Sequence, residues 1–92
     1  MALDNKKIKE KLNTVQDWEL VQDKIKRTFV LENFTSALEF VNKVGELAEE
    51  SDHHPNILMH DWNKVTVTST THSEGGVTDK DIDLAKRINE KT

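Results

Sequence analysis

The chain has 92 residues, which suits one domain spanning residues 1–92, because two separate cores would each be too small to be stable. Hydrophobic residues make up 35% and charged residues 33%, which favours a thin two-layer fold and leaves subunit association as a way to bury more apolar surface. The formal net charge of −4 argues against direct nucleic-acid binding, and the absence of cysteine excludes disulfides, a thiolate nucleophile and cysteine-ligated zinc.

The N-terminal region carries no apolar stretch of signal-peptide length, and no segment is long and apolar enough to span a bilayer. A basic run at residues 24–27 is interrupted by Ile25, so a solvated strand face explains it better than a polyanion-binding patch. We therefore expect a cytoplasmic protein with no membrane partner and no direct nucleic-acid partner.

The first half of the chain predicts a helix, two strands and a longer helix. In chain order these elements cover residues 4–13, 18–21, 24–31 and 34–51. Ile8 and Leu12 are four residues apart and so share one face of the first helix. Residues 24–31 alternate between apolar and polar side chains, as a half-buried strand does, although Arg27 falls on the apolar side.

The long helix has the clearest pattern in the sequence. Asn33 is a suitable N-cap, and apolar residues then recur at helical spacing up to Ala48. Pro55 cannot continue a helix and disfavours helical geometry at His54, so we expect the helix to end near Ser51.

The second half predicts two strands, at residues 57–60 and 64–71, and a final helix. Val65 and Val67 point to one face of the last strand, whereas alternation places His72 on the other face if the strand continues without a bulge. The final helix should begin with a capping box at Thr78 and Asp81. Strands joined by short turns pair antiparallel, so the α-β-β-α-β-β-α order predicts an α+β two-layer sandwich with three helices on one face of a four-stranded sheet.

Four histidines lie between residues 53 and 72, and three of them fall where the chain leaves regular structure. Histidine can donate and accept protons near neutral pH, which makes His53, His54 and His72 candidates for acid–base chemistry. Two histidines at a helix end could equally serve only to interact with the helix dipole. His60 lacks a distinguishing context and is expected on the surface or in a turn.

Other chemistries have weaker support. Imidazoles and carboxylates can ligate zinc or iron, but adjacent histidines diverge, and no His-x-x-x-His or His-x-His pair is present. The serines lack a nucleophile-elbow setting, and Gly75-Gly76 fits a common turn better than a phosphate loop. We expect neither a metal nor a cofactor.

A longer pattern joins these residues. Glu49 is followed by three residues, His53-His54-Pro55, six residues, Trp62, nine residues, His72, eight residues and Asp81. This spacing closely resembles the signature of the pterin-4a-carbinolamine dehydratases, and the resemblance covers most of the chain from Trp18 onward. It implies α+β subunits assembled as a homodimer or homotetramer. It also implies dehydration of 4a-hydroxytetrahydropterin to quinonoid dihydropterin.

The resemblance further implies a set of site residues. Its catalytic histidines are His53, His54 and His72, with most of the proton transfer expected at His53 and His72. The residues expected to bind the pterin substrate are Glu49, Asp52, Thr70, Thr71 and Trp18. Several of these have a plain structural alternative: a core position for Trp18, a strand position for the threonines, and a solvated helix end for the acids.

Two members of the pattern are given structural roles instead. Asp81 is explained by its capping-box position, and Trp62 is expected to pack the strand turn. Ser73-Glu74 stands where some relatives carry Glu-Cys, a difference that leaves proton transfer intact. The alternative function is a pterin-binding or assembly module that acts mainly through protein partners, and a metal-dependent hydrolase is a third class.

Overall fold

A computed structural model describes all residues from 1 to 92. The elements are α1 (Asn5–Leu12), β1 (Glu19–Val21), β2 (Lys24–Val30), α2 (Phe34–Ser51), β3 (Asn56–His60), β4 (Lys64–Ser69), the short 3-10 helix η1 (His72–Glu74) and α3 (Asp79–Asn89). Apart from η1, this is the order expected from the sequence, and the α+β class is confirmed. None of the helices combines the length and the apolar character that a bilayer crossing needs.

The sheet is antiparallel throughout, with the strand order β1-β2-β4-β3. The pairing of β2 with β4 joins the two halves of the chain, and β1 and β3 are the edge strands. Left-handed backbone conformations close the two hairpins, at Gln22 between β1 and β2 and at Asp61 and Trp62 between β3 and β4.

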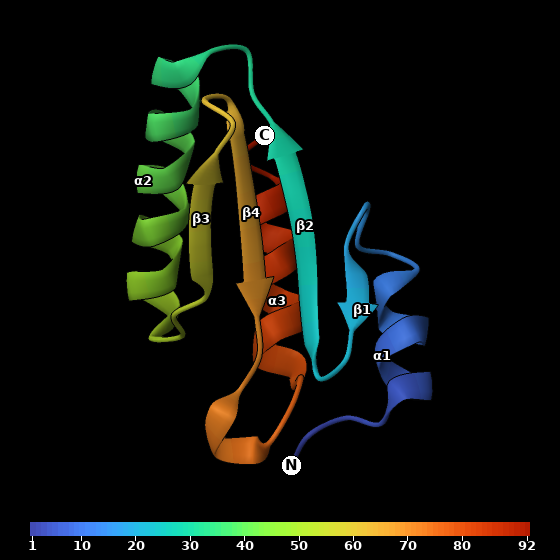
Figure 1. The fold of residues 1–92 in the computed structure, drawn as a ribbon. Coiled ribbons are helices and arrows are strands. Elements are labelled where there is room, and N and C mark those ends of the chain that lie inside the picture. The colour runs from blue at the N-terminus through green and yellow to red at the C-terminus, as the bar shows by residue number, and fades with distance from the viewer.

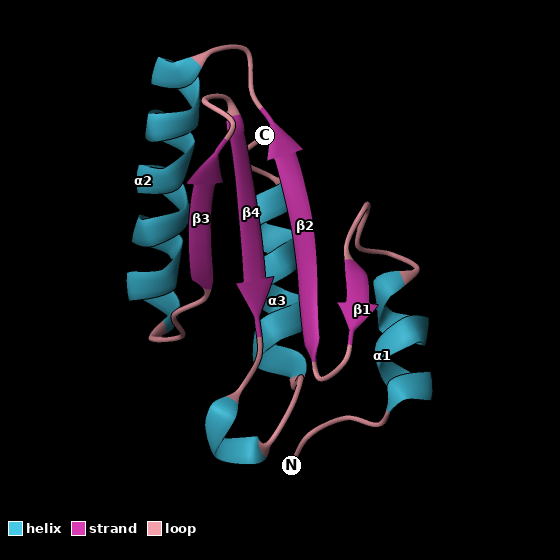
Figure 2. Ribbon diagram, in the orientation of Figure 1, coloured by secondary structure: helices cyan, strands magenta, loops and turns pink.

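The helices cover one face of this sheet. Figures 1 and 2 show α3 running behind β4 and β2, α2 beside β3 and α1 beside β1. The strand residues that face the helices include Ile25, Phe29, Val65 and Val67, all almost completely buried. They belong to one cluster of 16 buried hydrophobic residues to which all three helices contribute.

Arg27 departs from the apolar pattern of the covered face without disrupting the core. Its guanidinium carbon lies 4.2 Å from the centre of the Phe29 ring, and its Nη1 donates to Asn89 Oδ1 at 2.7 Å. An ion pair with Asp17 at 3.5 Å completes this environment. Stacking and partial pairing therefore explain how a cation is accommodated on this side of the sheet.

The last strand ends earlier than the alternation suggested. The prediction extended it to residue 71, but β4 ends at Ser69, and Thr71 forms only an isolated bridge with Gly76. The chain then turns through η1, with Gly75 in a left-handed conformation, so His72 lies in this short helix and not on the strand. The capping box at Thr78 and Asp81 is confirmed, as is Asn33 at the start of α2.

Candidate functional site

The Asp81 carboxylate lies at the centre of the candidate site. It is fully buried in the first turn of α3. One oxygen, Oδ1, contacts His53 Nε2 and accepts from Ser69 Oγ, each at 2.5 Å. The other oxygen, Oδ2, accepts from Thr71 Oγ1 at 2.7 Å and from the Thr78 backbone N–H at 2.9 Å. This one side chain therefore joins the end of α2, the end of β4 and the start of α3.

These contacts fix the charge of Asp81 and the donor on His53. Burial, the largest single influence, raises the pKa of Asp81, but hydrogen bonds from His53, Ser69, Thr78 and Thr71 outweigh it and lower the pKa below its ordinary value. An ionised carboxylate only accepts hydrogen bonds, so His53 must carry its proton on Nε2. In the neutral ring this leaves Nδ1 as the nitrogen that can accept a proton.

The end of α2 turns His53 back toward α3. Asp52 adopts a left-handed conformation, and the His53 backbone N–H returns to the Ala48 carbonyl at 3.1 Å. Arg87 of α3 also holds this end, since it donates to Ser51 Oγ at 2.9 Å and pairs with Glu50 at 3.1 Å. The His53 side chain is consequently 11% exposed, whereas the neighbouring His54 is 58% exposed.

His54 is held differently from His53. Its Nε2 is hydrogen-bonded to Glu49 Oε2, one turn back along α2. Both side chains are largely exposed, so this pair adds little to stability, but it sets the direction of the imidazole ring.

His72 begins η1 and is exposed. Its neighbour Thr71 donates to the same Asp81 carboxylate that holds His53, so the fold brings the two histidine-bearing segments to one point. No hydrogen bond joins the His72 side chain to His53 or His54, which leaves its ring nitrogens open to solvent or ligand. Asp81 thus links His53 to the segment that precedes His72.

The other predicted binding residues differ in their positions. Thr70 Oγ1 donates to the Asp23 carbonyl at 2.7 Å and ties the loop to the β1–β2 turn. Asp52 is exposed at the end of α2, beside the histidines. Trp18 is 5% exposed in the core, edge-on to Phe29.

Trp18 also lies far from the histidines along α3. Its indole N–H donates to Asn89 Oδ1 at 2.7 Å, and Asn89 is eight residues from Asp81, roughly 12 Å along the helix. The geometry therefore matches the core alternative for Trp18 and not a position over the site.

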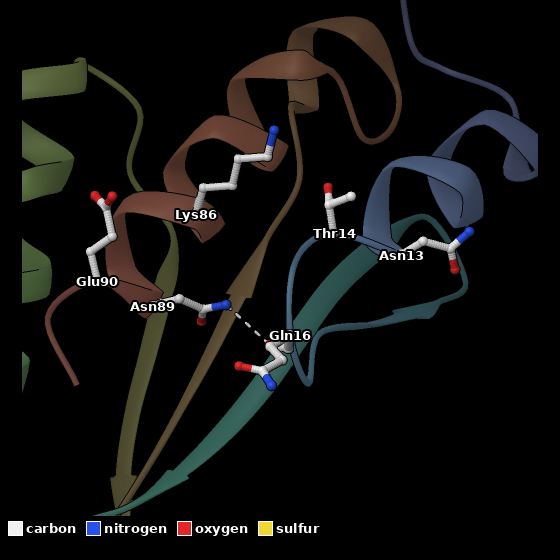
Figure 3. A pocket seen from close by; sticks show the side chains of 6 residues that line it. All are labelled: Asn13, Thr14, Gln16, Lys86, Asn89 and Glu90. Carbon is white, nitrogen blue, oxygen red and sulfur yellow. Dashed lines mark hydrogen bonds between the residues drawn. The ribbon is translucent and has the colours of Figure 1, made fainter.

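Surface hollows flank the start of α3. One of about 210 Å³ is lined by His53, Lys80 and Asp83, and another of about 290 Å³ is lined by Thr71, Thr78 and Lys80. A larger polar hollow, of about 430 Å³, lies at the other end of α3 and contains no histidine (Figure 3). Its lining residues are Asn13, Thr14, Gln16, Lys86, Asn89 and Glu90. Nowhere do three His, Asp or Glu side chains converge as a metal site would require.

Asp81 and Ser69 were missed as site residues by the sequence analysis. The capping box was a sufficient local explanation for Asp81, and it is correct for Oδ2, but Oδ1 also positions His53. The one signal for this role was the place of Asp81 in the spaced pattern. Ser69 carried no signal beyond its strand.

Comparison with known proteins relates nearly the whole chain to one family. The family model described as pterin 4 alpha carbinolamine dehydratase matches residues 1–91. A relative from Sulfolobus acidocaldarius is 45% identical over 89 residues, covering 97% of each chain. One from Picosynechococcus sp. is 48% identical over 83 residues, covering 90% of this chain and 89% of its own. Both carry the provisional name pterin-4-alpha-carbinolamine dehydratase.

Two solved structures share the fold. The crystal structure of a transcriptional coactivator/pterin dehydratase from Brucella melitensis has a TM-score of 0.92 and 35% identity, covering 98% of this chain and 97% of its own. A pterin dehydratase-like protein identified as a RuBisCO assembly factor in the alpha-carboxysome has a TM-score of 0.64 and 19% identity, covering 79% of this chain and 83% of its own. At that identity, the second comparison bears on the fold alone.

Proposed function

Because this chain belongs to the pterin 4 alpha carbinolamine dehydratase family, we propose that it removes water from a 4a-hydroxytetrahydropterin by histidine acid–base catalysis. The product would be a quinonoid dihydropterin. The observation that carries the proposal is the contact of His53 with the buried Asp81, which also binds the loop bearing His72. In this proposal the two rings come from distant parts of the chain and act on one bound pterin.

The reaction requires two proton movements at adjacent atoms. The hydroxyl on C4a must gain a proton so that its C–O bond breaks and water leaves. The N5–H bond then gives its electrons to a new N5=C4a double bond as a base removes the proton. A histidine with one nitrogen held by a carboxylate and the other free suits either step, and each positioned acid or base contributes on the order of 10² to 10⁴ in rate.

Within this proposal, His53 and His72 carry out the proton transfers, and His54 binds and orients the pterin. The pairing of His54 with Glu49 supports an orienting role, because it restricts the ring at an exposed site. Asp52 and Glu49 can accept hydrogen bonds from the N–H groups of a pterin. Thr71 acts through Asp81, and Thr70 fixes the loop through Asp23.

The test is a steady-state assay with freshly generated 4a-hydroxytetrahydropterin. We expect the double variant His53→Ala/His72→Ala to form quinonoid dihydropterin at least about 100-fold more slowly, after subtraction of the uncatalysed reaction. His60→Ala is the matched control, because His60 lies on the sheet face that the helices leave open. Its replacement should leave the rate unchanged. An unchanged rate in the double variant would contradict the proposed chemistry.

A second candidate is a module that acts through protein partners. It is favoured by Phe34 and Leu38, one turn apart on α2, which are 52% and 45% exposed. The name of the Brucella melitensis protein joins a coactivator role to the dehydratase one. If purified protein of correct fold shows no dehydration above the uncatalysed rate, this candidate is preferred.

The cytoplasmic location stays a prediction.

A further inference from the structure

A chain of hydrogen bonds crosses the sheet face that the helices leave open. Asp61 Oδ2 lies 2.8 Å from His60 Nδ1, and His60 Nε2 lies 2.8 Å from Thr66 Oγ1. Thr66 Oγ1 in turn lies 2.8 Å from Thr28 Oγ1 on the neighbouring strand. None of these four residues belongs to the site around Asp81.

Strand register explains why these side chains meet. Thr66 of β4 pairs with Thr28 of β2 on one side and with Leu58 of β3 on the other. His60 is two residues beyond Leu58 and so points to the same face, one pair along. The β3–β4 turn then places the Asp61 carboxylate, whose backbone is in a left-handed conformation, against Nδ1 of the His60 ring.

The direction of each hydrogen bond follows from Asp61. The hydrogen bond with His60, and then the charge of Lys64, lower the pKa of Asp61, so its carboxylate is ionised and can only accept. His60 therefore carries a proton on Nδ1, and in the neutral ring Nε2 accepts the Thr66 hydroxyl proton. Thr28 then donates to Thr66.

The result is a hydroxyl directed at an imidazole that a carboxylate orients. This is the arrangement that activates a hydroxyl as a nucleophile, because the histidine can take the hydroxyl proton as the oxygen attacks. The group is also reachable, since the side chains of His60 and Asp61 are 31% and 68% exposed and Thr66 itself is only partly buried. Thr68 lies two residues along on the same face, and its hydroxyl has no hydrogen bond to a histidine.

We propose that Thr66 is an acyl-acceptor site for activated esters. Its Oγ attacks the acyl carbon while His60 Nε2 takes the hydroxyl proton. The C–O bond to the leaving group breaks, and the proton passes to the departing aryloxide, which gives an acyl ester of Thr66 and a phenol. Water can later hydrolyse this ester and restore the hydroxyl, with the carboxylic acid as the second product.

The strand pairing limits how reactive this site can be. β4 is paired on both sides, so the backbone N–H groups around Thr66 are used by the sheet and cannot stabilise an oxyanion. We therefore expect reaction with esters of good leaving groups, and slow turnover after the first acyl transfer.

The test uses p-nitrophenyl acetate with the intact protein, followed by peptide mapping by mass spectrometry. We expect one acetyl group on Thr66 and none there in Thr66→Val. The acetylation rate of Thr66 should fall about 100-fold in His60→Ala, and Thr68→Val should react as the parent does. Asp61→Asn should slow the reaction without abolishing it, because His60 is retained but less firmly oriented.

Lys64 and Lys26 are competing nucleophiles on this face. Alkaline hydroxylamine distinguishes an acetylated threonine from an acetylated lysine, because it cleaves the alkyl ester on Thr66 and leaves the lysine amides intact. Thermal unfolding of each variant controls for loss of fold, and Thr66→Ser, which keeps the hydroxyl, should still be acetylated. Acetylation confined to lysines, or a Thr66 rate unchanged in correctly folded His60→Ala, would overturn the proposal.

Discussion

The two carboxylate oxygens of Asp81 have different roles. Oδ2 accepts hydrogen bonds from the Thr78 backbone N–H, which caps α3, and from the Thr71 hydroxyl, whereas Oδ1 accepts from His53 and Ser69. A buried carboxylate is unfavourable unless donors surround it, and here four donors do so. The same contacts that allow Asp81 to be buried also determine which nitrogen of His53 carries a proton.

Replacing Asp81 with asparagine tests this dual role. An amide of the same shape keeps one acceptor oxygen but turns the other position into a donor, which faces donors it cannot satisfy. We expect Asp81→Asn to lower the free energy of unfolding by about 1–3 kcal/mol, measured by urea denaturation at neutral pH. We also expect a fall in kcat with a smaller change in KM, because Asp81 positions His53 and does not touch the substrate. If Ser69→Ala and Asp81→Asn lowered both the free energy of unfolding and kcat to the same extent, Asp81 would have a purely structural role.

The lowered pKa of Asp81 also predicts an acid-sensitive stability. Because the folded-state pKa lies below the unfolded value of about 3.9, the contribution of this group is present above that value. It is lost as the pH falls further, through the folded-state pKa. Urea denaturation measured from pH 6 downward should show stability decreasing with acid, with a smaller decrease in Asp81→Asn. Parallel curves for the two proteins would contradict this assignment.

At the scale of elements, the end of α2 determines how the histidine pair is presented. Asp52 ends the helix in a left-handed conformation, with φ at 50°, and thereby directs His53 inward while His54 stays exposed. A non-glycine residue in this conformation is strained, although aspartate tolerates it better than most.

Asp52→Gly separates strain from substrate binding. We expect the free energy of unfolding to rise by roughly 0.5–1 kcal/mol, because glycine adopts a positive φ without the steric penalty. If Asp52 binds the pterin, KM should rise in the same variant. Gln22→Gly is the matched control, since Gln22 is also exposed at a positive φ of 58° and should gain stability with KM unchanged. A loss of stability in both variants would show that these turns are not strained.

The sequence predicted the elements well where periodicity and capping are local signals. The bounds of α2 followed from Asn33 and Pro55, and β2 was predicted to within one residue of its observed end at Val30. The end of β4 was not predictable, because small polar residues like those of the strand continue past Ser69, although the pairing with the neighbouring strands ends there. Strand pairing is a property of two segments, and neither one displays it alone.

The site was predictable as a set of residues but not as a geometry. The spaced pattern identified the three histidines as site residues. The contact of His53 with Asp81, however, joins residues 28 apart in the sequence that meet only when α3 packs against α2. A local explanation of Asp81 as a cap was correct and concealed its second contact. Trp18 shows the opposite case, because aromatic chemistry suited a flat ligand while the packing against Phe29 places it in the core.

On the scale of the whole molecule, one stripe on the surface of α2 remains apolar. The helices cover a single face of the sheet, yet Phe34 and Leu38 of α2 stay exposed, with the partly buried Val41 and Gly45 continuing the same stripe at helical spacing. The stripe lies on the helix beside β3, which is an edge strand with a free row of backbone groups. A second copy that covered both features would extend a core that is thin for a chain of this composition.

Self-association through α2 is therefore expected in solution, in agreement with the homodimer or homotetramer predicted from the sequence. Leu38→Lys should reduce the molecular mass measured by light scattering after gel filtration, because a charge in an apolar contact is strongly unfavourable. Val30→Lys is the matched control, since Val30 is 66% exposed on the open face of the inner strand β2, away from both the stripe and β3, and its replacement should leave the mass unchanged. A monomeric parent protein would contradict the assembly. A mass lowered by Val30→Lys alone would move the interface from α2 to the open face of the sheet.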